Sequence, residues 1–372
     1  MAALSILSLW SFPAYANDWS PMDVRESGLE IIAELAEGPG NIAVGPGGRV
    51  FLTMHQAFGP SLKLVELLRD GSTRPYPDSE WAYAPDADGV GLHAPLGLQV
   101  DQSGVLWVID NAAGVSLDAG VPKVFAWDTR EEALHRVISI PAPYSTPNSF
   151  INDLAVDRAN NALYLADVRG TDGPALVVID LETGEMRRRM VNDASFQLED
   201  DAPIVINDLE TRNVGSDGKP VRHRSGLNPI TLDPNAEWVY YGAMHGTSIY
   251  RIRSADLRDF SLTDTELATR VERYGDKPVS DGITIDAAGN VYITDLNGKA
   301  IGITKPDGTY ETLVTDELMI WPDSVSAGPN GHIWVAINQL NLSAPLNGGT
   351  NISVPPFYVA RVPAVAPLIV GR

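Results

Sequence analysis

Aspartate and asparagine residues stand directly before several strand-like segments of the chain, and their oxygens are the first candidates for chemistry. Asn152 and Asp153 lie side by side in SFINDLAVD, and Asn228, Asp281 and Asp323 hold similar places in other segments. Carboxylate and amide oxygens are the ligands that hard cations such as Ca²⁺ prefer, and they also hydrogen-bond polar organic molecules. Such residues also cap loops by accepting local N–H bonds, which is the alternative explanation for any one of them.

The segments that carry these residues resemble one another. Each consists of two runs of alternating apolar and polar residues around a turn of Asp, Asn, Pro or Gly, which is the pattern of a β-hairpin. The hairpin recurs at intervals of roughly 40 to 75 residues, in the range of propeller blades with inserted loops. The six units begin at Gly40, Leu96, Asp153, Asn228, Asp281 and Asp323.

These six units predict an all-β protein with a six-bladed β-propeller fold, because further strand-like segments lie between them and no segment shows sustained helical periodicity. A large β-sandwich is the alternative, which the repeat disfavours. The segment FYVARV at 357–362 is expected to pair with an N-terminal strand and close the ring, which removes exposed strand edges. We expect a single propeller domain over residues 17–372.

The repeat also predicts where the Asx residues meet. The innermost strand of each propeller blade lines the axis, so equivalent positions lie at equivalent heights. Aligning the units places Asp153, Asn228, Asp281 and Asp323 at one register, with an apolar residue or a glycine in the other two units. These side chains, with the neighbouring Asn152, are therefore expected to converge at one end of the central channel. The shared register favours a common site over independent loop caps.

Composition limits the classes of partner. The chain has 372 residues, is 44% hydrophobic and carries a formal net charge of −21, which is a globular composition with a surface that repels nucleic acid. No segment after the N-terminal one has the about 18 apolar residues that a membrane span needs. The chain has no cysteine, which excludes disulfides and thiol chemistry. A small-molecule ligand is the expected partner.

The N-terminal segment MAALSILSLWSFPAYAND predicts export. Its short apolar run ends in Ala-Tyr-Ala, an A-x-A-like cleavage site, so residues 1–16 are interpreted as a signal peptide. The usual positively charged start is missing, so we expect this peptide to be partial. The predicted localisation is secreted or periplasmic. A buried N-terminal helix is the alternative.

Four longer motifs together resemble a known family. FINDLAVD, YYGAMHGTSIYRI, KPVSDGITIDAAGNVYITDLNGKAI and WPDSVSAGPNGHIWVAINQLN are similar to the bacterial branch of the major royal jelly and Yellow protein family. The resemblance runs from about residue 29 to residue 363. It implies a secreted six-bladed propeller. Some members of that family are associated with dopachrome conversion, others bind biogenic amines, and many have no known activity. The cysteines of the insect members are absent here.

A more distant resemblance is to the gluconolactonase-type propellers, which hydrolyse lactones with one divalent metal at the channel mouth. EGP at Glu37 resembles the first ligand motif of that family, FINDLAVD gives Asn152 a substrate or metal role, and SDGITID makes Asp281 a carboxylate ligand. The fourth blade departs from the pattern. The family has Asn followed by Gly there, whereas SGLNPITLD offers Asn228 only with a shift of two residues.

Two functions are therefore expected. In the first, a divalent metal, with Ca²⁺ preferred, is bound by Asp281, Asn228 and Glu37 and polarises the carbonyl of a lactone or ester. Asp153 or a histidine, His245 for preference, then activates water as a general base.

In the second function, the protein binds an amine or aromatic molecule without chemistry. Under either function the substrate- or ligand-binding residues are expected to be Asn152, Asp323, Trp321 and Tyr241. A purely structural propeller, in which the Asx residues only cap loops, is a third possibility. The acidic segment 192–224 is predicted to be a long insertion between blades, which acts as a lid or as an edge.

Overall fold

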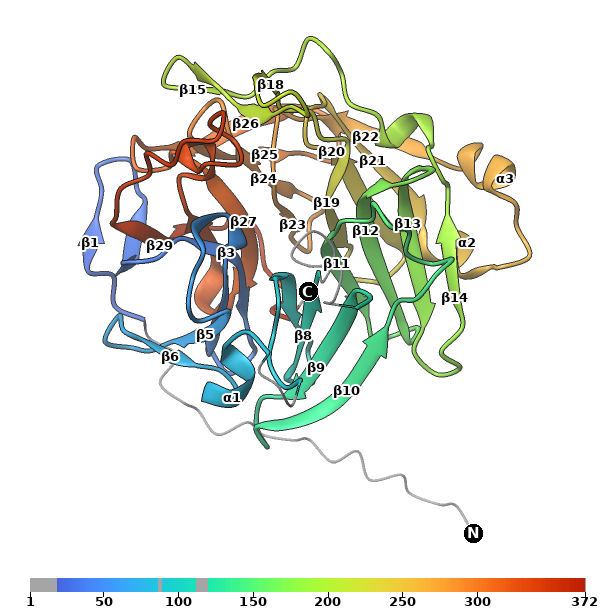
Figure 1. Ribbon diagram of the computed structural model, residues 1–372, viewed down its shortest axis with the longest axis horizontal. Coiled ribbons are helices and arrows are strands. Elements are labelled where there is room, and N and C mark those ends of the chain that lie inside the picture. Colours follow the sequence, from blue (N-terminus) through green and yellow to red (C-terminus); the bar gives the residue numbers. More distant parts are fainter. Residues whose placement is uncertain (1–18, 86–88, 112–119, 372) are drawn as a thin grey trace.

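A computed structural model describes residues 19–85, 89–111 and 120–371 of the chain. The predicted signal peptide at 1–16 lies outside the described residues. Figure 1 shows sheets arranged radially around a central axis, which confirms the predicted six-bladed β-propeller. The helices in the described ranges include α1 (Ser79–Ala82), α2 (Ser254–Arg258) and α3 (Asp264–Ala268), and none of them has the length and apolarity to span a bilayer.

Each blade is an antiparallel sheet, and the first strand of each blade lies nearest the axis. Blade 1 comprises β3 (Pro39–Val44), β4 (Val50–Met54), β5 (Leu64–Leu67) and β6 (Thr73–Pro75). Blade 2 comprises β7 (Pro95–Val100), β8 (Val105–Asp110), β9 (Lys123–Asp128) and β10 (Ala133–Ser139). Blade 3 comprises β11 (Ile151–Asp157), β12 (Ala162–Gly170), β13 (Gly173–Asp180) and β14 (Met186–Arg189).

The other three blades follow the same order. Blade 4 comprises β19 (Leu227–Leu232), β20 (Trp238–Ala243), β21 (Ser248–Arg253) and β22 (Glu272–Asp276). Blade 5 comprises β23 (Ile283–Ile285), β24 (Val291–Asp295), β25 (Ala300–Thr304) and β26 (Tyr310–Thr315). Blade 6 comprises β27 (Pro322–Gly328), β28 (His332–Ile337), β29 (Phe357–Pro363), β2 (Glu30–Leu35) and β1 (Asp23–Val24).

The ring is closed by pairing between the two ends of the fold. Strand β2 runs antiparallel to β29, with Glu30 opposite Arg361, so blade 6 is built from both ends of the described chain. An ion pair reinforces the pairing, since Arg361 Nε lies 2.6 Å from Glu30 Oε2. The expected closure by residues 357–362 is confirmed.

The hydrophobic core lies between neighbouring sheets. The cluster between blades 3 and 4 is typical, and it includes the fully buried side chains of Tyr164, Leu176, Tyr241 and Ile252. Burial of apolar surface stabilises a fold by roughly 25 cal/mol per Å², so these interfaces hold the inner strands in place. The residues that line the channel can therefore be polar, because the apolar core lies between the blades and not on the axis.

One end of the channel collects the longer loops. The six inner strands run in one direction, so the loops that precede them and the loops between second and third strands share one end, which we call the mouth. The mouth loops include 55–63 and 338–356, whereas the opposite end has tight turns such as 45–49 and 286–290. Binding residues of rigid scaffolds commonly lie on such loops.

The insertion, residues 192–224, lies at the mouth end between blades 3 and 4 in sequence. It contains a short 3₁₀ helix and two hairpins, β15 (Val205–Ile206) with β16 (Leu209–Glu210), and β17 (Arg212–Val214) with β18 (Pro220–Arg222). The hydrogen bonds that anchor it include Glu199 N to His245 O (2.7 Å), Val205 N to Asn297 Oδ1 (2.8 Å) and Arg212 N to Leu346 O (2.8 Å). The insertion therefore spans from blade 4 across blade 5 to blade 6 (Figure 1).

Candidate functional site

Five of the six inner strands begin with a β-bulge. The pairing of β3, β7, β11, β19 and β27 with the second strand of the same blade shifts register near its mouth end. In β11 the shift lies between Ile151 and Asp153. A bulge sets two residues against one on the partner strand and re-aims side chains, so consecutive residues can serve one site. This geometry brings both Asn152 and Asp153 to the axis.

The bulge also changes the expected alignment of the blades. The register of β11 on β12 matches that of β27 on β28 when Asp153 is aligned with Ser324. Asn152 is therefore the equivalent of Asp323, and Asp153 lies one residue further into the channel. The expected register, which equated Asp153 with Asp323, differs from this by one residue because the extra residue of a bulge leaves no mark in the alternation of the strand.

Four residues from four successive blades form an arc at the mouth, and the first three of them are joined by hydrogen bonds. Asn152 donates through Nδ2 to Asn228 Oδ1, and Asn228 Nδ2 donates to Asp281 Oδ1 at 2.6 Å. Asp323 of blade 6 follows Asp281, and each of these carboxylates is at most 8% exposed. We call these four residues, with Asp153 below them, the acidic arc.

The arc is one-sided. Gly40 and Leu96 hold the equivalent positions in blades 1 and 2, where a methyl group added at Gly40 would lie 3.3 Å from the Leu96 side chain. The mouth of the channel is thus polar over blades 3 to 6 and apolar over blades 1 and 2. At the level of these four residues, a ligand would meet carboxylates and amides on the side of blades 3 to 6 only.

Residues behind the arc hold its carboxylates in place. Trp321 Nε1 donates to Asp281 Oδ2 at 2.8 Å, so both oxygens of Asp281 accept a hydrogen bond. The amide of Asp281 in turn donates to Thr294 Oγ1 at 3.0 Å. Asn338 donates through Nδ2 to Asp323 Oδ2. These contacts fix the carboxylates before any ligand arrives, which lowers the entropic cost of binding.

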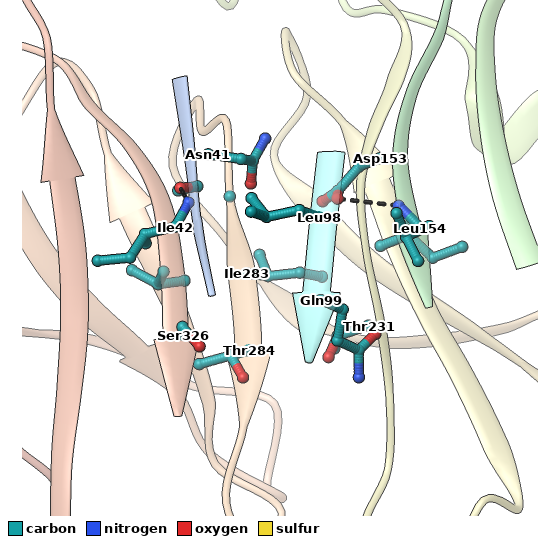
Figure 2. A pocket seen from close by; sticks show the side chains of 14 residues that line it. Asn41, Ile42, Leu98, Gln99, Asp153, Leu154, Thr231, Ile283, Thr284 and Ser326 are labelled. Carbon is teal, nitrogen blue, oxygen red and sulfur yellow. Dashed lines mark hydrogen bonds between the residues drawn. The ribbon is translucent and has the colours of Figure 1, made fainter. Parts of the chain in front are cut away.

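Figure 2 shows the channel below the arc, with Asn41 and Asp153 at its upper end. A cavity of about 40 Å³ lies there, enough for a few water molecules and too small for an organic ligand. One apolar residue from each inner strand lines it, namely Ile42, Leu98, Leu154, Ile230, Ile283 and Val325. Gln99, Thr231, Thr284 and Ser326 form a second polar layer beyond them. The apolar layer limits the water that can reach the carboxylates from below.

Close packing of the inner strands keeps the channel narrow. A methyl group added at Gly97 would lie 2.6 Å from Asn152 O and 2.8 Å from Asp153 Cα. A methyl group at Gly282 would lie 2.8 Å from Asp323 O. Such distances are below any normal carbon contact, so these two positions admit only glycine without movement of the neighbouring strand.

The environment of the three carboxylates disfavours their ionised forms and raises their pKa values. Burial, reinforced by the charge of Asp281, raises the pKa of Asp153 to about 7. Burial raises the pKa of Asp281 to about 6 despite the hydrogen bonds from Trp321 and Asn228. Burial and the charge of Asp281 raise the pKa of Asp323 well above its usual range. Among the described residues, no Lys, Arg or His lies within 4.0 Å of these carboxylates to form an ion pair.

Two residues expected at the site make no described contact with the acidic arc. Tyr241 is on β20 inside the core between blades 3 and 4, where its hydroxyl lies 2.9 Å from Ser195 Oγ. Glu37 is exposed on the loop between β2 and β3, and its charge acts on Lys63. Trp321 is near the arc but fully buried, so it offers the site its N–H rather than its ring face.

His245 lies on the loop between β20 and β21, at the mouth. Its Nδ1 lies 3.2 Å from both the amide and the carbonyl of Ser225, and its ring packs edge-on against His223 at 5.1 Å between centroids. Burial lowers its pKa to about 4, so it is neutral at pH 7. None of these contacts reaches the acidic arc. His55, at the end of β4, accepts a hydrogen bond from the amide of Ala57 at 3.0 Å.

Sequence reasoning missed two residues of the site. Asn41, one residue after the first-blade glycine, lines the channel, and Asn338 bonds Asp323 from the end of β28. The nearest signal in the repeat lies one residue away from Asn338. Asp110 on β8 and Asp167 on β12 have the strand pairing of Ile337, the residue before Asn338.

Comparisons with known proteins identify several proteins to which this chain is similar. Major royal jelly protein 1 of Apis mellifera is 23% identical over 234 residues, which cover 58% of this chain and 50% of the relative. The matched part thus amounts to about half the length of that relative. A gluconolactonase from Xanthomonas campestris superposes with a TM-score of 0.54 at 12% identity, covering 94% of this chain and 92% of that one.

A calcium-binding protein, regucalcin from Agrobacterium tumefaciens, superposes with a TM-score of 0.50 at 13% identity, covering 95% of this chain and 96% of that one. At these identities both likenesses concern the fold. The sequence profile of the family described as Major royal jelly protein matches residues 94–345, more than half of the chain. The chain therefore belongs to the major royal jelly protein family.

Proposed function

We propose that this protein hydrolyses a small lactone or ester at the mouth of its channel, with a divalent cation, Ca²⁺ for preference, bound in the acidic arc. The observation that carries the proposal is a set of three carboxylates, the buried Asp281 and Asp323 and the half-buried Asp153, which face one axis and form no ion pair with any described Lys, Arg or His. A bound cation would compensate their mutual repulsion and the loss of hydration. The family membership and the gluconolactonase-like fold are consistent with this proposal.

The donor chemistry fits such a cation. All available donors are oxygens, and Ca²⁺ takes six to eight oxygens from carboxylates, amides and water. Within the described ranges no three acidic or histidine side chains form a metal site by themselves, so amide oxygens of Asn152 and Asn228 and water must complete the coordination. Glu37, which is exposed on its loop, is not needed in this set. The small cavity supplies space for the water.

Each residue of the arc then has a defined task. When bound, the cation would polarise the substrate carbonyl and stabilise the negative charge that develops on its oxygen. Asp153, with a pKa of about 7, is part deprotonated at neutral pH and can accept the proton of the attacking water. As the water oxygen bonds to the carbonyl carbon and the ester C–O bond breaks, Asp153 returns the proton to the leaving alkoxide. Asn228 and Trp321 keep Asp281 oriented.

The test is a panel of lactones and esters assayed with added Ca²⁺ and with a chelator. We expect turnover that requires the cation, that disappears in Asp281→Ala and that falls by about 10²-fold or more in Asp153→Asn. Asp110→Asn is the matched control, because Asp110 is equally buried but accepts hydrogen bonds from the amides of His93 and Ala94 outside the arc. Turnover that survives both chelation and Asp281→Ala would contradict the proposal.

A second candidate is the binding of a cationic organic molecule without chemistry. The one-sided mouth favours it, since an ammonium group could face the arc while an apolar part faces Leu96 and Gly40. Calorimetry with phenethylamine on chelated protein tests this function. Binding that Asp281→Ala abolishes and that Ca²⁺ competes away, together with no turnover, would replace the first proposal by this one. Export, which the N-terminal segment predicts, is part of either proposal.

A further inference from the structure

Trp321 lies at the point where the insertion meets the acidic arc. Its side chain is fully buried in an apolar cluster at the mouth. That cluster joins Ile204 and Ile206 of the insertion to Met244 of blade 4 and Leu296 of blade 5. The indole ring therefore belongs to an apolar cluster to which both the insertion and the blades contribute.

The same indole makes a directed contact with the site. Its Nε1–H donates to Asp281 Oδ2 at 2.8 Å, and an indole nitrogen can act only as a donor. A donor held against a carboxylate supports the ionised form and restricts its rotation. The other oxygen of Asp281 is held by Asn228, so the carboxylate is fixed from two sides. Of these two donors, Trp321 is the one that shares an apolar cluster with the insertion.

The insertion is itself held on the propeller by hydrogen bonds to blades 5 and 6. Asn297 of blade 5 accepts from Val205 N at 2.8 Å and donates through Nδ2 to Pro203 O at 3.0 Å. On the blade 6 side, Arg212 N donates to Leu346 O at 2.8 Å. An element anchored on both sides of Trp321 can hold the ring in one place.

We propose that the insertion sets the position of the Asp281 carboxylate through Trp321, which makes Trp321 a positioning residue and not a contact for the ligand. The proposal rests on the proposed function for the identity of the cation that Asp281 would bind. It gives the insertion the role of a fixed clamp on the site. The coupling is reciprocal, so a cation on Asp281 would also hold the insertion more firmly.

The decisive variant replaces Trp321 by benzothienylalanine, which keeps the fused ring and carries sulfur in place of the N–H. The apolar packing survives, so a merely structural role would leave Ca²⁺ affinity unchanged. We expect the affinity measured by calorimetry to fall about tenfold or more. Trp334 is the matched control: it is fully buried in blade 6, whose inner strand begins directly after Trp321, and its Nε1 has no hydrogen-bond partner among the described residues. The same replacement there should leave the affinity within about twofold.

A second pair of variants tests the insertion. Ile204→Ala shortens a side chain that packs in the Trp321 cluster, whereas Val205→Ala shortens its neighbour, which is 36% exposed. We expect only Ile204→Ala to weaken Ca²⁺ binding. Combined with benzothienylalanine at position 321, it should have a smaller further effect than it has alone, because both changes act through one contact.

The outcomes separate this inference from the proposed function. If the wild-type protein binds Ca²⁺ and benzothienylalanine at 321 changes nothing, the inference is wrong and the proposed function stands. If the wild-type protein binds no Ca²⁺, the proposed function fails and amide hydrogen exchange decides the inference. Faster exchange at residues 204–206 in Asp281→Ala than in the wild type would then support the coupling, and unchanged exchange would overturn it.

Discussion

At the scale of single residues, the environment of Asp153 links the stability of the fold to pH. Its folded pKa of about 7 exceeds the ordinary value of 3.8, so between these values the folded state binds more protons than the unfolded state. The free energy of unfolding therefore falls as pH rises from about 4 to about 7 and stays low above that. In the absence of a cation, the ionised Asp153 carboxylate lowers the free energy of unfolding at neutral pH and above.

Replacing Asp153 by Asn should remove that cost. In chelated protein we expect Asp153→Asn to raise the free energy of unfolding by about 2–4 kcal/mol at pH 8 and to have little effect near pH 4, as measured by urea unfolding. Asp316 gives a control of opposite sign. Burial alone would raise its pKa, but the hydrogen bonds from Ser27 and from the amide of Leu318, with the charge of Arg25, outweigh burial and lower it. Asp316→Asn should therefore destabilise at pH 8. Parallel pH curves for wild type and Asp153→Asn would refute the argument.

For single residues, the sequence could identify most of the site but not the exact register or the direction of every side chain. Asn228, Asp281 and Asp323 could be recognised, with the adjacent pair Asn152 and Asp153, because Asx residues recur before the first strands of a repeat. Whether Asn152 or Asp153 belongs to that level depended on a bulge, which shifts the register without altering the hydrophobic alternation. Tyr241 lies on a strand next to the mouth but points into the core between blades, and alternation alone does not tell a channel face from a core face.

At the scale of elements, the inner strands must approach closely to bring the arc together. Gly97→Ala would place a methyl group against the backbone of β11 at Asn152 and Asp153. We expect a loss of about 1–3 kcal/mol in the free energy of unfolding, and weaker Ca²⁺ binding, because the arc must shift to admit the methyl group. The matched control is Gly47→Ala, since a methyl group there meets nothing within 4 Å. Equal stability and affinity in the two variants would show that the close approach is not required.

The insertion shows what the sequence could predict for an element. Its length and polarity marked residues 192–224 as an excursion between blades, and the structure confirms an excursion with short hairpins. Its path across blade 5 to blade 6 depends on contacts such as that between Arg212 and Leu346, which are far apart in the chain. No local pattern carries that information, so the clamp on Trp321 could be seen only in three dimensions.

At the scale of the whole molecule, the fold depends on closing the ring. The repeat predicted both the number of blades and the closing strand at 357–362, because each blade buries its faces only against its neighbours. The closure is reinforced where Arg361 pairs with Glu30 across β29 and β2. This pair ties together residues that are far apart in the chain, and it is mostly buried.

Removing one partner of that pair should weaken the closure. We expect Glu30→Gln to lower the free energy of unfolding by about 1–3 kcal/mol, because Arg361 is left buried with a weaker partner. Glu237→Gln is the control, since its partner Arg253 is exposed and such surface pairs contribute about 0–1 kcal/mol. Denaturant unfolding of both variants measures the difference. If Glu30→Gln costs no more than Glu237→Gln, the ion pair does not contribute to closure.

The most direct test of the central claim is calorimetric titration of the chelated protein with Ca²⁺, supported by metal analysis of the protein as isolated. The account predicts about one Ca²⁺ per chain, a higher melting temperature on binding, loss of both effects in Asp281→Ala, and retention of both in Asp110→Asn. No binding at millimolar Ca²⁺, or binding that Asp281→Ala leaves intact, would show that the acidic arc is not a cation site.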